Sequence, residues 1–556
     1  MAVEQSTQNK MKRVILLFLK IIAIEECVFF IVANYFFEIK PLSISPLFLL
    51  SLFILFSLNW YDKKYKKKDY FKVRSILILG SLTCLVVFLR TSIFWAMNTF
   101  PLKDANMVLL TLQEPFDDFA YLMLKQYFET TIPQTLLISI VLVFFLYVLL
   151  GSFKKRLVLI GSYFIATIAF VFIDIPVFDY VHILNDEPEK NASYSEFFVE
   201  NYVNPDSVTI LPPEKKRNLI FIYLESLETT FADKEHGGNQ EANLIPEITR
   251  LAQENISFGK NKNHIGGGLD ANGSNSTFTS LHTRTLGIPH LVNYQKTPVL
   301  RHYKSLYKIL NDNGYKQIFF QGNPGLYNQF RNFVKDQTIE EIYGPDDLIQ
   351  RLNLDVNVLI RNQGYKTVQD KDAFKFATQI LDTISEPFSL TFFTIDTHAP
   401  HGLYDPDCIK CSDEKNEDER LKATALCVSR ELDKFLNSLK EKEFYENTTI
   451  VILGDHLFMG TRLVKDFPNR KWVNVFINSP KNPINEDNRR FSDVDIFPTI
   501  LSSMNFDIEG NKLGFGTDLF SDKKTLVEML GLDSLNRAFN TIPQHLVLES
   551  HLLKKN

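Results

Sequence analysis

The sequence predicts two dissimilar parts, an α-helical membrane domain of five transmembrane helices and then an exported α/β domain with a mostly parallel sheet. Three observations support this prediction. The first 180 of the 556 residues hold five long apolar runs, clusters of Lys and Arg flank alternate runs, and short apolar runs alternate with helical patterns after residue 217. A chain this long also exceeds one ordinary domain. Its net charge of −5 provides no global basic field for nucleic acid, which we therefore exclude as a partner.

The five apolar runs of the first part define the expected transmembrane helices. A helix needs about 20 apolar residues to cross a bilayer. The first run is too long for the apolar core of a signal peptide, and no small-residue cleavage site follows it, so we expect it to remain as a helix. The runs lie near Val14–Phe36, Pro46–Trp60, Ser75–Trp95, Ile132–Gly151 and Leu157–Phe178, and the second is the shortest.

The basic residues set the expected orientation in the membrane. Lys and Arg cluster before the first run, in residues 62–74 between the second and third, and in residues 154–156 between the fourth and fifth. Cytoplasmic loops carry such an excess of positive charge. With five spans, everything after about residue 180 then lies on the outer side of the membrane. Five buried helices of a soluble protein would not require this alternation of charge.

Composition also suggests domain boundaries. We expect the membrane domain over residues 1–180, a linker over 181–216, the exported α/β domain over 217–525 and a C-terminal helical tail over 526–556. The outer loop near 97–131 mixes apolar and acidic residues at near-helical spacing. Such a segment either lies along the outer membrane boundary or packs on the exported domain.

The exported domain alternates strands with helices. Its expected strands are near-continuous apolar runs, as in strands buried on both faces. Helical patterns separate them, and this alternation predicts a mostly parallel sheet covered by helices. The strands are expected at residues 218–226, 316–322, 388–396, 447–455 and 472–480, and the helices include residues 299–313, 372–385 and 418–442.

Carboxylate and imidazole side chains gather where the expected strands end. Glu225 ends the first strand, Asp396 and His398 follow the third, and Asp455 and His456 end the fourth. Each has an ordinary structural explanation alone, but ligands bind at the carboxyl ends of parallel strands, so their joint placement indicates a site. Mixed carboxylate and imidazole ligands suit Zn²⁺ or Mn²⁺ better than Mg²⁺. The two adjacent residues at the fourth strand can share one ion only if the strand has ended between them, because successive side chains of a strand point to opposite faces.

A hydroxyl-rich stretch, "GSNSTFTSLHTRTLGIP" (273–289), supplies candidate nucleophiles. A helix is expected to begin near Ser274 or Asn275, which are both good N-caps. A hydroxyl group in the first turn gains from the helix dipole, which stabilises an alkoxide or a bound phosphate. Ser274, Ser276 and Thr277 are therefore the candidates, and capping without chemistry is the alternative.

Three cysteines lie in the exported part, where disulfides can form. They are Cys408, Cys411 and Cys427. We expect one disulfide that includes Cys427, with one thiol left over, and the spacing leaves the pairing open. A zinc site from "CIKC" is not expected, because no second cysteine pair follows.

The motifs of the exported domain together resemble a known family. They are "NLIFIYLESLETTF" (218–231), "NGSNSTFTSLHTRTLGIP" (272–289), "YKILNDNGYKQIFFQGN" (307–323), "TFFTIDTHAPHG" (391–402), "TIVILGDHLFMG" (449–460) and "FSDVDIFPTIL" (491–501). This combination resembles the membrane-bound phosphoglycerol transferases of the sulfatase/alkaline phosphatase superfamily, which include lipoteichoic acid synthase and the osmoregulated periplasmic glucan phosphoglycerol transferase. The resemblance implies an alkaline-phosphatase-like (sulfatase-like) fold for the exported domain.

The resemblance also implies a site. One divalent metal ion, Mn²⁺ or Zn²⁺, would be held by Glu225, Thr277, Asp455 and His456, with Thr277 as the catalytic nucleophile. His398 would bind phosphate and substrate and act as a catalytic acid or base. Asn323 and Arg331 are further candidates for substrate binding, and Arg284 is a candidate phosphate contact. The stretch 320–331 matches the family's pattern only loosely.

The implied function is metal-dependent transfer of phosphoglycerol from phosphatidylglycerol to a glycan, a lipid-linked glycan or another hydroxyl acceptor. Transfer would pass through a phospho-threonine and release diacylglycerol into the membrane. Two alternatives remain. One is a phosphoethanolamine transferase acting on a lipid or glycan, and the other is an inactive membrane scaffold, which would lack a metal ligand or the nucleophile. No such residue is missing here.

Overall fold

The computed structural model describes most of the chain from residue 192 to residue 540 and short pieces before it. The described residues are 80–81, 84–85, 87–88, 91–92, 95, 127–129, 131–140, 192–271, 276–290, 303–323, 327–357, 367–399, 402–413, 416–459, 463–464, 467 and 470–540. The chain divides into two compact units. The first comprises Met1–Trp95 and Lys125–Pro176, and the second comprises Ala96–Leu124 and Val177–Asn556.

The described pieces of the first unit are helical and contact one another. The Oγ1 atoms of Thr91 and Thr135 lie 2.6 Å apart, and Ser92 Oγ lies 2.5 Å from the hydroxyl of Tyr127. Within the described residues, no helix is long and apolar enough to span a bilayer. The expected spans at 14–36, 46–60 and 157–178 lie outside the described residues, and those at 75–95 and 132–151 and the loop 97–131 are described only in part.

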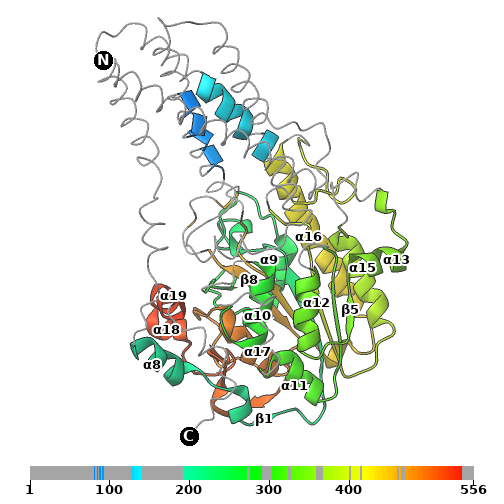
Figure 1. Ribbon diagram of the computed structural model, residues 1–556. Coiled ribbons are helices and arrows are strands. Elements are labelled where there is room, and N and C mark those ends of the chain that lie inside the picture. Colours follow the sequence, from blue (N-terminus) through cyan, green and yellow to red (C-terminus); the bar gives the residue numbers. More distant parts are fainter. Residues whose placement is uncertain are drawn as a thin grey trace, which may run out of the picture. The chain divides into compact units, whose positions relative to one another are not determined.

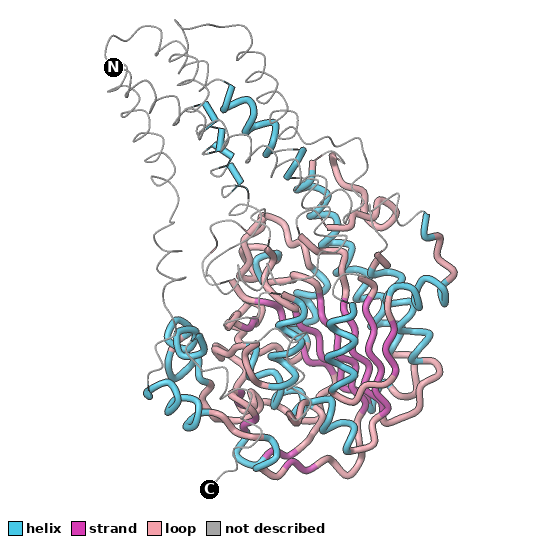
Figure 2. Tube along the Cα trace, viewed as in Figure 1, coloured by secondary structure: helices cyan, strands magenta, loops and turns pink. Residues whose placement is uncertain are grey.

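A seven-stranded sheet forms the centre of the second unit (Figure 2). Its strands are β3 (Gly267–Gly268), β8 (Trp472–Ile477), β7 (Thr448–Gly454), β2 (Asn218–Leu224), β6 (Phe388–Phe393), β4 (Lys316–Gln321) and β5 (Glu341–Tyr343), in this spatial order. The five strands from β7 to β5 are parallel, whereas β8 and β3 are antiparallel to their neighbours. The structure confirms the mostly parallel sheet and all five expected strands.

Side chains of β2 alternate between two hydrophobic cores. Leu219, Phe221 and Tyr223 belong to one core, and Ile220, Ile222 and Leu224 belong to the other. Every residue of this strand is buried, which explains its continuous apolar run.

Helices cover both faces of the sheet (Figure 1). The first core is shared by α10 (Thr277–Leu286), α11 (Leu306–Asp312), α12 (Tyr327–Asp336) and α17 (Ile496–Ser503). The second core is shared by α9 (Pro246–Glu254), α13 (Pro345–Leu352), α15 (Asp370–Leu381) and α16 (Glu417–Leu439). Elements α15 and α16 confirm two of the expected helical stretches, and α11 confirms the second half of the stretch 299–313.

Segments at both ends of this unit pack on the first core. Phe198 of α8 (Ala192–Asn201) lies against Phe515, and Phe539 of α19 (Leu532–Asn540) contacts the same ring. The remaining short elements are η1 (Pro205–Ser207), β1 (Ile210–Leu211), η2 (Thr229–Phe231), η5 (Tyr445–Asn447), η6 (Asp493–Asp495), β9 (Asp507–Ile508), η7 (Glu509–Asn511), β10 (Lys512–Leu513), β11 (Gly516–Thr517) and α18 (Leu526–Leu530). The domain boundaries suggested by composition stay predictions.

Candidate active site

Glu225 follows the last residue of β2 and is 1% exposed. The next residue, Ser226, has a φ of 53°, a left-handed conformation that is uncommon for a residue with a side chain. This turn lets the Ser226 hydroxyl donate to Glu225 Oε1 at 2.7 Å and its backbone N–H donate to Asp455 Oδ1 at 2.6 Å. The end of β2 is thus joined to the residue that follows the neighbouring strand.

Asp455 and His456 directly follow β7, which ends at Gly454. Both residues lie beyond the end of the strand, so strand alternation does not direct their side chains to opposite faces, and they can share one ion. Asp455 Oδ1 also accepts from the backbone N–H of His456 at 2.7 Å. His456 Nδ1 lies 2.9 Å from the carbonyl oxygen of Leu457, which can only accept, so Nδ1 carries the proton. The lone pair of the ring therefore lies on Nε2, the atom that can bind a metal.

Three predicted ligands converge at this edge of the sheet. Glu225, Asp455 and His456 each offer a ligand atom within 4.8 Å of the others, and all three are buried. His456 Nε2 lies 3.5 Å from both Glu225 Oε1 and Asp455 Oδ2.

The charge of this group fits a divalent cation. Burial, and next the nearby carboxylate of Asp455, raise the pKa of Glu225 to about 8. Asp455 Oδ2 is buried without a hydrogen-bond partner. Two buried carboxylates and an unprotonated imidazole nitrogen form the type of donor set that Zn²⁺ or Mn²⁺ takes.

Thr277 lies beside this group at the start of α10. Its hydroxyl donates to Glu225 Oε2 at 3.4 Å. The helix begins later than expected, because the N-cap is Ser276, whose Oγ accepts from Thr279 N at 3.4 Å. Ser274 and Asn275 lie outside the described residues. Among the described candidate hydroxyls, Ser276 caps the helix and Thr277 faces the predicted metal ligands.

The loop after β6 carries His398 and is attached to Glu225. Glu225 N donates to Thr394 Oγ1 at 2.9 Å, and the Thr397 hydroxyl donates to the carbonyl oxygen of Glu225. His398 is half-buried, and its Nδ1 lies 2.8 Å from the carbonyl oxygen of Ala399, which assigns the proton to Nδ1. The roles predicted for His398 stay predictions.

The other substrate-binding candidates have different surroundings. Asn323 is half-buried after β4, and Arg331 is exposed on α12. Arg284 is fully buried and pairs with Asp493, so the idea that it contacts phosphate is wrong. A side chain with no exposed surface and with buried partners for its charge cannot reach a ligand in solvent. The substrate-binding roles of Asn323 and Arg331 stay predictions.

Three interactions near the site were not anticipated from sequence. Glu228, three residues after Glu225, is buried and pairs with Arg470. Asp370, at the start of α15, accepts from the backbone N–H groups of Ile395 and Asp396 at 2.6 and 3.2 Å. Burial raises the pKa of Asp370 to about 7. The third is the Arg284–Asp493 pair. The sequence signal for these interactions was weak. It consisted of acidic residues within apolar stretches, and their partners lie far away along the chain.

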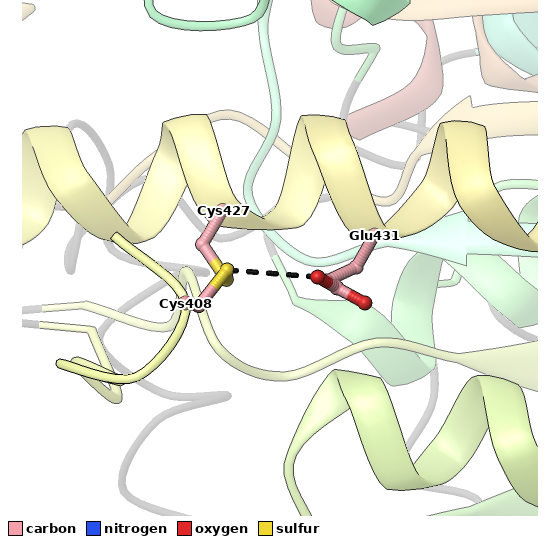
Figure 3. Close-up of side chains that lie close together, drawn as sticks. All are labelled: Cys408, Cys427 and Glu431. Atoms are coloured by element: carbon pink, nitrogen blue, oxygen red, sulfur yellow. Dashed lines mark hydrogen bonds between the residues drawn. A yellow bond between two sulfur atoms is a disulfide. The ribbon is translucent and has the colours of Figure 1, made fainter.

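Cys408 and Cys427 form a disulfide, and Cys411 is a free thiol. This agrees with the expectation of one disulfide that includes Cys427. Glu431 Oε1 lies 3.7 Å from Cys408 Sγ (Figure 3). Because the two sulfur atoms are bonded to each other, this cluster offers no thiolate to a metal.

The sequence matches the sulfatase family over residues 217–506, which is more than half of the chain. The chain belongs to the sulfatase family. The matched region of this sulfatase contains Glu225, Thr277, Asp455 and His456, together with the whole seven-stranded sheet. The predicted sulfatase-like fold of this region and its place in the sulfatase family are confirmed.

Curated relatives of the chain include phosphoglycerol transferase I of Salmonella typhi and of Salmonella paratyphi B. Each is 26% identical over 279 residues, which is 48% of this chain and 34% of the relative. The chain therefore spans about a third of the length of the curated relatives it matches.

Solved structures similar to this chain include the lipoteichoic acid synthase LtaP from Listeria monocytogenes. It is 15% identical, has a TM-score of 0.45, and the likeness covers 59% of this chain and 81% of LtaP. Lipooligosaccharide phosphoethanolamine transferase A from Neisseria meningitidis is 14% identical with a TM-score of 0.45, and the likeness covers 86% of this chain and 92% of that protein.

Proposed function

We propose that this protein transfers phosphoglycerol from phosphatidylglycerol to a hydroxyl acceptor through a phospho-threonine intermediate on Thr277. The observation that carries the proposal is the Thr277 hydroxyl, 3.4 Å from Glu225 and beside the buried Asp455 and His456. The name of the curated relatives, phosphoglycerol transferase I, supports the choice of the transferred group.

Glu225, Asp455, His456 and Thr277 would hold the divalent metal. When bound, Zn²⁺ or Mn²⁺ supplies positive charge that lowers the pKa of a bound hydroxyl and polarises a phosphoryl oxygen. Ser226 and the backbone of His456 orient the Asp455 carboxylate, and Leu457 orients the His456 ring. These contacts hold the ligand atoms in place before substrate arrives, which reduces reorganisation during the reaction.

In the first step, Thr277 Oγ1 attacks phosphorus and the bond from phosphorus to the diacylglycerol oxygen breaks. The Thr277 hydroxyl donates to Glu225 Oε2. This carboxylate would accept the hydroxyl proton as Oγ1 attacks and return it when Thr277 leaves in the second step. Thr277 is the first residue of α10, where unpaired backbone N–H groups favour an anionic phosphoryl group. His398 carries a proton on Nδ1. In its imidazolium form it would also carry one on Nε2, which it would give to the leaving diacylglycerol oxygen and take back from the acceptor hydroxyl in the second step.

In the second step, an acceptor hydroxyl attacks phosphorus and Thr277 leaves. We propose a glycan or lipid-linked glycan as the acceptor, on the outer face of the bacterial cytoplasmic membrane. The alternation of basic clusters with apolar runs supports this location. A lipid donor requires the site to work at the membrane surface, and diacylglycerol then stays in the bilayer.

The test uses the purified full-length chain with phosphatidylglycerol vesicles and added Mn²⁺ or Zn²⁺. We expect diacylglycerol release and a phosphoglyceryl group on Thr277 by mass spectrometry. Thr277→Ala should lower the rate of release by about six orders of magnitude, as loss of a nucleophile does. Thr285→Ala is the matched control, because Thr285 lies in the same helix and its hydroxyl donates to backbone carbonyl oxygens of that helix, of Leu281 at 2.7 Å and of His282 at 3.4 Å.

Other outcomes contradict the proposal in distinct ways. Release that persists unchanged in Thr277→Ala rejects the nucleophile. Release from phosphatidylethanolamine in place of phosphatidylglycerol identifies a phosphoethanolamine transferase. No release from any glycerophospholipid in the presence of metal rejects lipid-dependent transfer.

A further inference from the structure

A buried ion pair lies beneath the candidate active site. The guanidinium of Arg284 and the carboxylate of Asp493 are both fully buried. Arg284 Nε donates to Asp493 Oδ1 at 2.8 Å, and Nη2 lies 2.7 Å from the same oxygen. The guanidinium also stacks on Trp472 of β8, with its carbon 4.1 Å from the ring centre.

Arg284 joins the helix of Thr277 to the strand of Asp455. Its Nη1 donates to the carbonyl oxygen of Gly454 at 2.7 Å, one residue before Asp455. Gly454 itself is closely enclosed, since a Cβ there would lie 1.9 Å from the carbonyl oxygen of Leu227. Arg284 follows Thr277 by seven residues, which places both on one face of α10, about 10 Å apart along the axis.

Asp493 joins a third segment to the pair. Its Oδ2 accepts from the backbone N–H of Ala271 at 3.2 Å. Ala271 lies six residues before Thr277 on the segment that leads into α10. The pair therefore contacts the chain before Thr277, the helix after it, and the end of the strand that leads to Asp455 and His456.

We propose that Arg284 and Asp493 are positioning residues that set the Thr277 hydroxyl relative to the metal ligands Asp455 and His456. The inference rests on the proposed function of Thr277 as nucleophile. Neither residue touches substrate. A buried ion pair contributes little net stability, because the cost of desolvating both charges offsets their attraction. The planar guanidinium of Arg284, however, donates to Asp493 and to the carbonyl oxygen of Gly454 in a fixed geometry, which a lysine ammonium cannot reproduce.

Two variants separate positioning from folding. Arg284→Lys keeps the charge but loses the fork that reaches both Asp493 and Gly454. The double variant Arg284→Met/Asp493→Leu removes both charges and keeps the volume, a change that buried ion pairs often tolerate. Arg489→Lys is the matched control, because Arg489 is also buried, at 6% exposed, and also pairs with a carboxylate, that of Glu528. Its other N–H groups donate to the carbonyl oxygens of Leu519, Ser521 and Lys523.

The experiment measures three quantities for the full-length chain. Calorimetry gives the affinity of the metal-stripped protein for Mn²⁺ or Zn²⁺, diacylglycerol release gives kcat and KM, and circular dichroism reports folding. We expect both Arg284 variants to lose roughly 10–100-fold in metal affinity and kcat, as for residues that orient metal ligands, with KM changed by less than about threefold. Arg489→Lys should change affinity and kcat by less than about twofold, whatever its melting temperature.

Wild-type kcat and metal affinity in a folded Arg284→Lys or double variant would overturn the inference. An equal loss in Arg489→Lys would also overturn it, since the effect would then be general destabilisation. If Arg284→Lys does not fold, the double variant decides. If the wild type releases no diacylglycerol, the proposed function fails, whereas the metal affinities still decide whether the pair positions the ligands.

Discussion

At the scale of single residues, two buried glutamates three positions apart have opposite surroundings. Glu228 pairs with Arg470, whose Nε lies 2.9 and 3.0 Å from its two carboxylate oxygens. Glu225 instead faces the carboxylate of Asp455, and no arginine or lysine pairs with it among the described residues. A buried carboxylate needs a positive partner, so Glu228 has a structural role and Glu225 is available to a metal.

The metal site is tested by Asp455→Asn. In the wild type, metal added at 100 times its Kd should stabilise the fold by about 2.7 kcal/mol and raise the melting temperature. The variant should lose this response. In chelator, the variant should melt higher than the wild type, because a neutral amide then replaces one of two adjacent buried carboxylates; besides burial, the charge of Asp455 raises the pKa of Glu225.

Differential scanning calorimetry with and without metal makes this measurement. Asp382→Asn is the control, since Asp382 is an exposed partner of Lys442 and should leave the metal response unchanged. An equal rise in melting temperature for Asp455→Asn and wild type would contradict the assignment of Asp455.

At the scale of elements, α10 does three things along its length. Its first residue presents the Thr277 hydroxyl, its middle packs on the first core, and its last turn holds Arg284. The start of the helix depends on Ser276, whose side chain caps it. The position of Thr277 thus depends on both a cap at one end and a buried ion pair at the other.

Removing the cap should separate stability from activity. Ser276→Ala and Ser305→Ala each remove an N-cap hydroxyl, from α10 and α11 respectively. Each should lower the free energy of unfolding by about 1 kcal/mol. Only Ser276→Ala should also lower the rate of diacylglycerol release, because only that cap adjoins Thr277. Urea titration and the release assay measure the two effects, and equal activity of the two variants would contradict this role.

Two buried histidines at the side of α10 away from the ion pair support a prediction about how stability depends on pH. His282 stacks edge-on against His290 with ring centres 4.8 Å apart, and both are buried. Burial lowers the pKa of His290 from an ordinary value of 6.5 to about 4. Because the folded state disfavours the charged ring, its contribution to stability is complete above pH 6.5 and is lost as the pH falls from 6.5 to about 4.

The pH effect is measured by urea unfolding at pH 7 and pH 4. A shift of this size corresponds to about 3 kcal/mol across the window. His290→Phe should reduce the loss by about that amount, whereas His264→Phe, at an exposed position, should not change it. A pH dependence of His290→Phe equal to that of the wild type would show that another group is responsible.

At the scale of the whole molecule, the sulfatase domain and the apolar first part of the chain differ in what their sequences are built for. The domain buries two cores on either side of one sheet and carries the site at one edge of it. The first part carries basic clusters in alternate loops. The predicted orientation therefore places residues 62–74 in the cytoplasm and the sulfatase domain outside.

Cysteine labelling tests this orientation. In a Cys411→Ser background, Glu241→Cys places a thiol at a side chain that is 89% exposed in the sulfatase domain, and Lys66→Cys places one in the segment 62–74. A membrane-impermeant maleimide should label the first in intact spheroplasts and the second only after detergent. Labelling of Lys66→Cys alone before detergent would reverse the topology.

The sequence by itself predicted the order of the strands along the chain and the candidate metal ligands at the strand ends. Buried parallel strands have continuous apolar runs, and their carboxyl ends share one edge, so Glu225, Asp455 and His456 were predictable without coordinates. The disulfide was predictable only in part, because three cysteines allow more than one pairing. The choice of Thr277 came from family resemblance.

Only the tertiary structure decided which polar residues support the site. Arg284 and Asp493 are 209 positions apart, and Glu228 and Arg470 are 242 apart. No local pattern records such pairing, because it depends on which helix packs across which strand end. For the same reason the sequence suggested a phosphate contact for Arg284, whereas burial against Trp472 and Asp493 makes it part of the support beneath Thr277.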